Sequence, residues 1–246
     1  MVDAQFSHPR LAAVYDPLDP DRSDLNAYTN LVEEFGARSV LDVGCGTGTF
    51  AGRLAEHEDI TMLGVDPAGA SIEVARSKVD SDHAEWIVGT ILDVTALPKW
   101  HGHFDLATMT ANVAQVFLDD QEWLSTLRAI HACLRGGGHL AFETRIPADR
   151  AWERWTKELT RQVVDIPGEG RVEHWIQATQ VNDGLVTFEA PTTFLADGER
   201  IESTSTLRFR TEENLTGSLE QTGFLDVEFR ELPYAPGRGW LIVAIT

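Results

Sequence analysis

Three glycines alternate with other residues directly after an apolar run, in the segment Val40 to Gly48 (VLDVGCGTG). Glycine lets the backbone turn tightly and approach a ligand closely, and open α/β sheets bind ligands at the carboxyl ends of their strands. Asp66 stands about twenty residues beyond this loop, where a carboxylate can accept both hydroxyls of a ribose. The spacing predicts a nucleotide-like ligand. The alternative is a tight connection between a strand and a helix that binds nothing.

The glycine spacing and the local charge separate two classes of nucleotide ligand. A dinucleotide loop of the form G-x-G-x-x-G would need glycine where Thr49 stands, and reading two residues later gives only the weaker form that ends at Ala51. No Lys or Arg occurs from 39 to 52, while Asp42 precedes the loop. This acidity suits a ligand with an ammonium or sulfonium group better than a pyrophosphate.

A repeating pattern of strands and helices, which begins near residue 38, must position these residues. Short β-branched runs alternate with helix-length amphipathic segments, as is typical of a parallel sheet covered on both faces. A helix that begins at Asp119, with Glu122 at capping-box spacing, is expected to stop at glycines 136–138. The expected strands are 39–43, 60–65, 85–88, 104–109, 139–144, 225–229 and 240–245. The pattern predicts an α/β fold.

The pattern changes between residues 171 and 210. Two strong hairpin signals, Asn182-Asp183-Gly184 and Asp197-Gly198, separate three β-rich runs. The three runs are 172–181, 185–195 and 200–210. We therefore expect an antiparallel β meander inserted into the α/β pattern.

These changes of pattern predict how the chain is divided. Insertions on a scaffold often form lids over a site, so the inserted region is expected to cover the substrate. The expected divisions are an N-terminal cap or lid (1–36), a ligand-binding core (37–145 and 211–246) and the inserted antiparallel region (146–210).

Composition excludes several classes of protein. The 246 residues carry 39 Asp plus Glu against 20 Lys plus Arg, a formal net charge of −19, and an acidic surface without a basic run argues against a nucleic-acid partner. Neither a secretory leader nor an apolar stretch near the roughly 20 residues of a membrane helix is recognisable, so we expect a cytoplasmic protein without a membrane partner. Cys45 and Cys133 have no C-x-x-C spacing, and His101 and His103 lack partners at ligand spacing, so no metal site is expected.

Five motifs in order resemble those of the class I S-adenosylmethionine-dependent methyltransferases. They are Leu41 to Gly48, Gly64 to Pro67, Gly89 to Asp93, Phe104 to Leu106 and Leu134 to Leu140. The resemblance covers roughly the first five strands and, through the C-terminal segment, the rest of the sheet. It implies a Rossmann-like sheet of seven strands, mostly parallel, with helices on both faces and an antiparallel last strand.

The resemblance also implies S-adenosylmethionine as the cofactor. The glycine loop would meet its methionine and ribose portions, Asp66 its ribose hydroxyls, and Asp42 would lie near its ammonium group. The family usually has an acidic residue where Thr90 stands; Thr90 or Asp93 would then meet the adenine, unless Asp93 only caps a helix. The residues expected to bind the cofactor are Tyr15, Asp42, Gly44, Cys45, Gly46, Asp66, Pro67, Thr90, Ile91 and Thr110.

In this family the acceptor usually lies over the carboxyl ends of strands four and five, which directs attention to the segments 110–115 and 143–145. Asn112 and His174 are the candidate catalytic residues, and the alternatives are a helix cap for Asn112 and a polar strand position for His174. Trp152 and Trp155 are candidate substrate contacts, and the alternative for both is an apolar packing face. The expected substrate-binding residues are Asn112, Gln115, Arg145, Trp152 and Trp155.

These residues together favour methyl transfer to a small-molecule acceptor by in-line displacement, for which alignment is the main requirement. The acidic surface and the inserted region both favour a small, enclosed substrate. Two alternatives stay open at this point. One is an oxidoreductase that binds NAD, and the other is a non-catalytic protein that binds S-adenosylmethionine through a methyltransferase-like domain.

Overall fold

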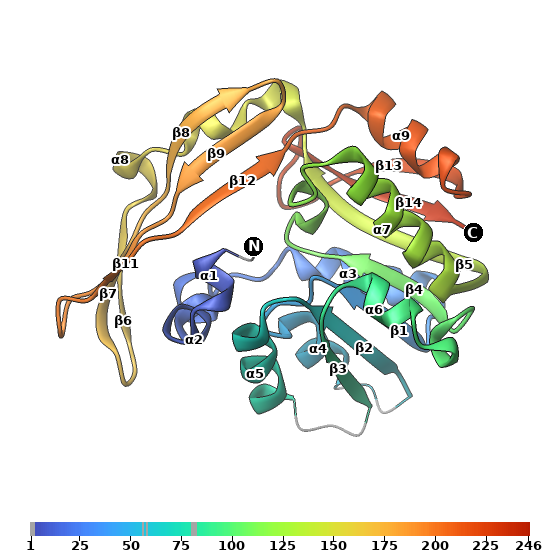
Figure 1. The fold of residues 1–246 in the computed structure, drawn as a ribbon, viewed down its shortest axis with the longest axis horizontal. Coiled ribbons are helices and arrows are strands. Elements are labelled where there is room, and N and C mark those ends of the chain that lie inside the picture. Colours follow the sequence, from blue (N-terminus) through green and yellow to red (C-terminus); the bar gives the residue numbers. More distant parts are fainter. Residues whose placement is uncertain (1–2, 56, 58, 80–82) are drawn as a thin grey trace.

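A seven-stranded sheet forms the centre of the computed structural model, which describes residues 3–55, 57, 59–79 and 83–246. The five strands β3, β2, β1, β4 and β5 are parallel, whereas β14 runs antiparallel between β5 and β13 (Figure 1). In spatial order the strands are β13 (Leu225–Glu231), β14 (Gly239–Ile245), β5 (Leu134–Arg145), β4 (Phe104–Met109), β1 (Ser39–Val43), β2 (Thr61–Asp66) and β3 (Ala84–Val88). The predicted fold class and the antiparallel last strand are confirmed.

Helices cover both faces of this sheet, because successive strand residues point to opposite faces. Val40 and Leu106 pack with α3 and α4, whereas their neighbours Leu41 and Ala107 pack with α6, α7 and α9. The helices of the core are α3 (Leu25–Glu34), α4 (Thr49–Leu54), α5 (Gly69–Lys78), α6 (Ile91–Thr95), α7 (Asp120–Cys133) and α9 (Glu212–Gln221). The 3₁₀ turns η1 (Pro98–Trp100) and η2 (Val113–Gln115) complete the core connections.

Helix α7 begins as predicted but ends early. The carboxylate of Asp119 accepts the backbone N–H groups of Gln121 and Glu122, at 2.9 and 3.0 Å. The expected stop at glycines 136–138 is wrong, because the helix ends at Cys133 and β5 runs through the glycines. A side chain at Gly138 would lie 3.0 Å from the carbonyl oxygen of Phe104, so this glycine lets β5 approach β4 where their pairing shifts.

The inserted region forms two antiparallel sheets rather than one meander. Strand β6 was not expected, and each predicted run splits into two strands that belong to different sheets. Pro191 breaks the second run, since proline cannot donate to a strand ladder, and the first run breaks beside the buried Trp175. The strands are β6 (Gln162–Ile166), β7 (Gly170–His174), β10 (Thr192–Phe194) and β11 (Arg200–Ile201) in one sheet, and β8 (Gln177–Asn182), β9 (Leu185–Glu189) and β12 (Thr204–Arg208) in the other.

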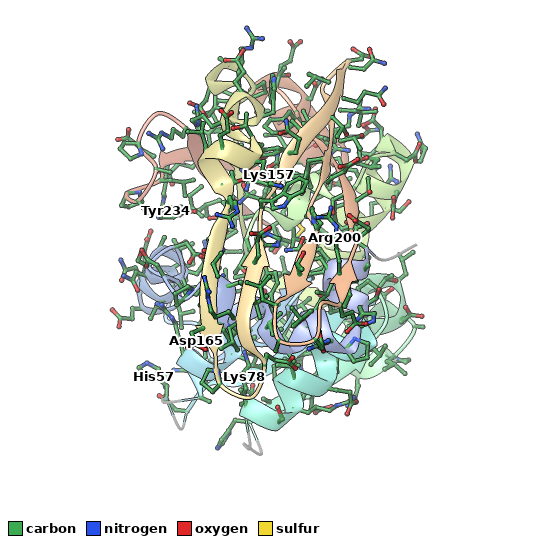
Figure 2. All side chains as sticks on the ribbon, turned by 90° about the vertical axis from the view of Figure 1, so that its left-hand side faces the viewer. His57, Lys78, Lys157, Asp165, Arg200 and Tyr234 are labelled. Carbon is green, nitrogen blue, oxygen red and sulfur yellow. The ribbon has the colours of Figure 1, made fainter. Side chains whose placement is uncertain are left out.

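Both predicted hairpins are present. The turn between β8 and β9 places Asp183 and Gly184 at φ of +47° and +76°, and the turn between β10 and β11 places Gly198 at +77°. Before β6 the chain forms η3 (Pro147–Asp149), η4 (Ala151–Arg154) and α8 (Lys157–Thr160). Figure 2, which faces the insert, shows β6 and β7 in front of the N-terminal helices, with Asp165 on this face.

Two N-terminal helices, α1 (Ala4–Ser7) and α2 (Pro9–Leu18), lie between the insert and the core sheet (Figure 1). Leu11 and Val14 of α2 form an apolar cluster with Val172 and Phe194 of the insert. The guanidinium of Arg10 lies over the ring of Phe194, 3.6 Å from its centre, and pairs with Glu169 and Asp197 at 2.7 and 2.8 Å. This cluster therefore attaches the N-terminal helices to the four-stranded sheet.

Replacing Phe194 with alanine tests this attachment. Phe194 is fully buried, so Phe194→Ala is expected to lower the free energy of unfolding by about 3–5 kcal/mol, measured by urea denaturation. Its neighbour Leu195 is 45% exposed, and Leu195→Ala is expected to change stability by less than about 0.5 kcal/mol. Equal effects of the two substitutions would contradict the packing described here.

Candidate functional site

The glycine loop connects β1 to α4 at the carboxyl edge of the sheet. Gly44 and Gly46 have φ of +74° and +52°, which favour glycine. A Cβ atom at Gly44 would lie 2.6 Å from the side chain of Val113, whereas one at Gly46 would meet nothing within 4 Å. The loop is therefore packed closely against the turn after β4, and its backbone is uncovered at Gly46.

Asp66 ends β2 and ties this loop to the next connection. One carboxylate oxygen accepts the N–H of Gly46 at 2.9 Å, and the other accepts the N–H of Ala68 at 2.7 Å. Burial raises the pKa of Asp66, while these two hydrogen bonds oppose the rise. Each carboxylate oxygen can accept more than one hydrogen bond, so both retain capacity for ligand hydroxyls.

Asp42, on β1, is a fully buried carboxylate with one oxygen unpaired. Its Oδ1 accepts the hydroxyl of Thr108 at 2.9 Å, and its Oδ2 has no partner. Burial raises the pKa of Asp42 to about 7, and the hydrogen bond from Thr108 lowers it. A buried acceptor without a partner is uncommon in native structures. It fits a cationic group of a ligand, such as an ammonium.

The N-terminal helix α2 contacts the same loop through Asp16, which sequence analysis missed. The Asp16 carboxylate accepts the hydroxyls of Thr47 and Thr49, at 2.7 and 3.1 Å, and pairs with Lys78 at 2.6 Å. The preceding residue, Tyr15, is partly buried, and its desolvation raises its pKa. The position of Asp16 next to Tyr15 in the predicted lid was the available signal.

Two further predicted cofactor residues lie after β3. The carboxylate of Asp93 accepts the backbone N–H and the hydroxyl of Thr90, at 2.8 and 3.0 Å, and so caps helix α6. Ile91 is buried in the core. The cap explains Asp93 without a ligand, and an adenine contact by Thr90 or Asp93 stays a prediction. Cys45 is buried, and burial raises the pKa of its thiol.

The predicted acceptor residues after β4 and β5 meet one another. Asn112 donates its backbone N–H to Glu143 at 3.1 Å, and its side chain makes no cap hydrogen bond. Arg145 donates to the amide oxygen of Gln115 at 2.8 Å, and burial lowers the pKa of Arg145. Thr110 is buried beside this group. The structure therefore brings the ends of β4 and β5 together.

The two tryptophans pack into the insert. Their ring centres lie 4.8 Å (Trp152) and 6.1 Å (Trp155) from that of Phe209, as the packing alternative proposed. The guanidinium of Arg145 lies 5.4 Å from the centre of the Trp155 ring, which links Trp155 to the predicted acceptor residues. A substrate contact by either tryptophan stays a prediction.

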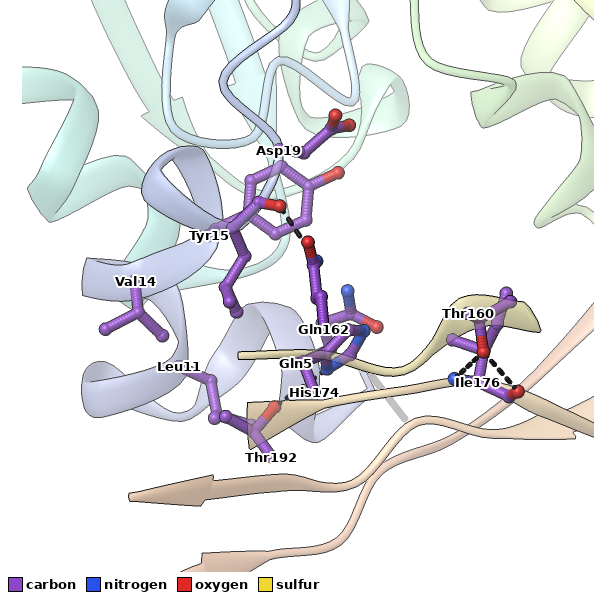
Figure 3. A pocket seen from close by; sticks show the side chains of 11 residues that line it. Gln5, Leu11, Val14, Tyr15, Asp19, Thr160, Gln162, His174, Ile176 and Thr192 are labelled. Atoms are coloured by element: carbon purple, nitrogen blue, oxygen red, sulfur yellow. Dashed lines mark hydrogen bonds between the residues drawn. The ribbon is translucent and has the colours of Figure 1, made fainter. Parts of the chain in front are cut away.

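A cavity of about 340 Å³ lies between the N-terminal helices and the insert. Figure 3 shows Tyr15 and Asp19 on one side, facing Gln162 and His174 on the other. The imidazole Nδ1 of His174 lies 3.0 Å from the hydroxyl of Thr192, and burial lowers the pKa of His174. The residues that line the cavity are Gln5, Leu11, Val14, Tyr15, Leu18, Asp19, Thr160, Gln162, His174, Ile176 and Thr192. The cavity is polar on several sides and contains no Lys or Arg in its lining.

Within the described part of the chain, no group of three or more His, Cys, Asp or Glu residues is arranged to hold a metal ion. The same residues include no helix with the length and apolarity to cross a membrane.

Comparisons with known proteins agree with this geometry. Residues 40–138 match the family described as methyltransferase domain. Over these residues the chain is therefore similar to a methyltransferase domain. The matched residues include the glycine loop, Asp66 and the turn after β4.

Curated methyltransferases match this chain over part of their length. The cypemycin N-terminal methyltransferase of a Streptomyces species is 29% identical over 125 residues, which are 51% of this chain and 49% of that protein. The O-methyltransferase rstn1 of Aspergillus nomiae is 32% identical over 133 residues, 50% of this chain and 57% of that protein. The chain thus spans about half the length of the curated relatives it matches.

Solved structures share the fold over nearly the whole chain. The CcbJ methyltransferase of Streptomyces caelestis superposes with a TM-score of 0.75 at 17% identity, covering 99% of this chain and 98% of that chain. The S-adenosylmethionine-bound CalS10, an amino pentose methyltransferase of Micromonospora echinaspora, superposes with a TM-score of 0.71 at 20% identity, covering 95% of each chain. The N-terminal helices and the insert therefore belong to a fold that occurs in known methyltransferases.

The unpaired oxygen of Asp42 predicts that the buried charge lowers the stability of the folded protein but strengthens ligand binding. Because the folded-state pKa, about 7, lies above the ordinary value for Asp, about 3.9, the folded protein binds more protons and loses stability as the pH rises between these values. Asp42→Asn keeps an acceptor for Thr108 and removes the buried charge. We expect a higher melting temperature than the wild type above pH 7, a difference that vanishes near pH 4, and weaker binding of S-adenosylhomocysteine.

The exposed Asp165 offers a matched control for this experiment. Asp165→Asn is expected to change neither the melting temperature nor the affinity for S-adenosylhomocysteine. If Asp42→Asn has a lower melting temperature than the wild type at alkaline pH, burial of the Asp42 charge does not destabilise the folded protein.

Proposed function

We propose that the protein transfers the methyl group of S-adenosylmethionine to a small-molecule acceptor. The observation that carries this proposal is the buried, unpartnered oxygen of Asp42 beneath a glycine loop that is open at Gly46. A cationic ligand compensates the Asp42 charge, whereas the pyrophosphate of NAD would be repelled by it. This favours the methyltransferase over the oxidoreductase alternative.

The residues present fit this cofactor. Asp42 would face its ammonium group, Asp66 would accept its ribose hydroxyls, and the backbone at Gly46 would lie against it. When bound, S-adenosylmethionine supplies an electrophilic methyl group that is displaced in line. The contribution of the chain is alignment, which effective-molarity estimates value at about 7–11 kcal/mol.

We propose that the acceptor occupies the cavity between the N-terminal helices and the insert. Tyr15 lines this cavity and belongs to the helix whose Asp16 contacts the glycine loop, so the cavity adjoins the cofactor loop. The neutral imidazole of His174 and the amide of Gln162 can hydrogen-bond a polar acceptor. Known proteins of this fold include an amino pentose and a sugar N-methyltransferase, which supports an acceptor of comparable size and polarity.

Asp66→Ala is expected to weaken the binding of S-adenosylhomocysteine by at least tenfold, because it removes charge-assisted hydrogen bonds to the ribose and the tie to Gly46. Titration calorimetry measures this, with NAD as the control ligand that should not bind. Glu85→Ala, which alters an exposed carboxylate on β3, should bind as the wild type does. Unchanged affinity in a folded Asp66→Ala protein would refute the ribose assignment.

His174→Ala tests the proposed acceptor site. A panel of small amines, phenols and sugars with labelled S-adenosylmethionine identifies an acceptor for the wild type. His174→Ala is then expected to reduce methyl transfer at least tenfold while the affinity for S-adenosylhomocysteine stays the same, since His174 lines the proposed acceptor cavity. Cofactor binding without methylation of any acceptor would instead favour the non-catalytic alternative.

A further inference from the structure

The turn after β4 has a backbone conformation that needs support from its surroundings. Ala111 and Asn112 are consecutive non-glycine residues with left-handed φ, +53° and +61°. Residues held in such sparsely populated conformations cluster at active sites and ligand clamps. The next residue, Val113, contacts the glycine loop at Gly44, so the turn forms one wall of the cofactor site.

Two hydrogen bonds from separate elements hold this turn. Tyr28 of α3 donates its hydroxyl to the carbonyl of Met109, at 3.3 Å, just before the turn. Glu143 of β5 accepts the backbone N–H of Asn112 at 3.1 Å with its Oε1 atom. The Glu143 side chain is only 1% exposed, so this contact is made away from water.

The second carboxylate oxygen of Glu143 accepts the hydroxyl of Tyr234, from the loop between β13 and β14. Tyr234 is 40% exposed and lies at the edge of the view in Figure 2. A C-terminal loop thus reaches, through one buried carboxylate, the turn beside the cofactor loop. Glu143 belongs to the segment 143–145 that is expected near the acceptor, whereas Tyr234 belongs to no recognisable motif.

The groups around Glu143 act on its ionisation in opposite directions. Burial raises its pKa, and the charge of Asp24, which precedes α3, adds to the rise. The hydroxyl of Tyr234, the charge of Arg145 and the N–H of Asn112 lower it. Tyr28, from α3, also lies within electrostatic range of Glu143.

We propose that Glu143 is a positioning residue for methyl transfer. Its ionised carboxylate, oriented by the hydroxyl of Tyr234, holds the Ala111–Asn112 turn against the glycine loop. Protonation of Glu143 removes one acceptor site and loosens the turn. The proposal rests on the proposed function, because the turn matters for catalysis only if the loop beside it binds S-adenosylmethionine.

Selective labelling with ¹⁵N-asparagine provides a direct readout, because the backbone amide of Asn112 is one of five asparagine signals. We expect this signal to titrate as the pH falls, with a midpoint above the ordinary range of Glu. Glu143→Gln should abolish that inflection, while any effect of Asp42 remains. Tyr234→Phe should move the midpoint to higher pH, since it removes a hydrogen bond that lowers the pKa of Glu143.

Tyr28→Phe is the matched control, because the hydroxyl that it removes donates to the carbonyl of Met109 rather than to Glu143. Its Asn112 inflection should stay in place. In the same spectra, Glu143→Gln should weaken the binding of S-adenosylhomocysteine by about threefold or more. If Glu143 had a merely structural role, Glu143→Gln and Tyr234→Phe would lower stability, and Tyr234→Phe would leave the midpoint of the Asn112 signal unchanged.

The outcomes separate the two proposals. If the wild type does not bind S-adenosylhomocysteine, the proposed function fails, whatever the Asn112 signal does. If it binds, an inflection that survives Glu143→Gln, a midpoint unmoved by Tyr234→Phe or an unchanged affinity in Glu143→Gln would each overturn the positioning role.

Discussion

This structure depends on keeping several carboxylates buried at one edge of a parallel sheet. Asp42, Asp66 and Glu143 come from β1, β2 and β5, and burial raises the pKa of each. Leaving water is costly for a charge unless hydrogen bonds or an opposite charge replace the hydration. Two backbone N–H groups do this for Asp66, and Tyr234 and Asn112 do it for Glu143. Asp42 keeps an unpaired oxygen, which the ammonium group of the proposed cofactor would pair.

The elements outside the sheet enclose this edge through contacts of the N-terminal helix α2. Its Asp16 contacts the threonines of the glycine loop, while its Arg10 and Leu11 contact the insert. One short helix thus joins the proposed cofactor and acceptor sites. The polar lining of the cavity, without Lys or Arg, complements an acceptor that carries hydroxyl or amine groups better than one that carries phosphate.

Particular elements show how far the sequence could be interpreted. The predicted range of β4 matches the observed one, because the polar segment 101–103 and the turn at 110–112 bound this strand. The glycines at 136–138 suggested a helix end, yet they lie within β5, and the small size of Gly138 allows the close approach of β5 to β4. The runs of the insert looked continuous, since β propensity persists where the chain passes from one sheet to the next. Strand β6 was missed because its burial comes from α2, far away in the sequence.

The sequence by itself indicated the resemblance to methyltransferases, the sheet and the acidic residues around the glycine loop, because local spacing and periodicity encode them. Only the tertiary structure decided which oxygen of Asp42 stays unpaired, that Asp16 contacts Thr47, and that Glu143 links Asn112 to Tyr234. These contacts join residues more than thirty positions apart in most cases, and their geometry depends on how helices and strands pack. A local sequence pattern does not specify the distances between residues that are far apart in the chain, because the packing of the fold determines these distances.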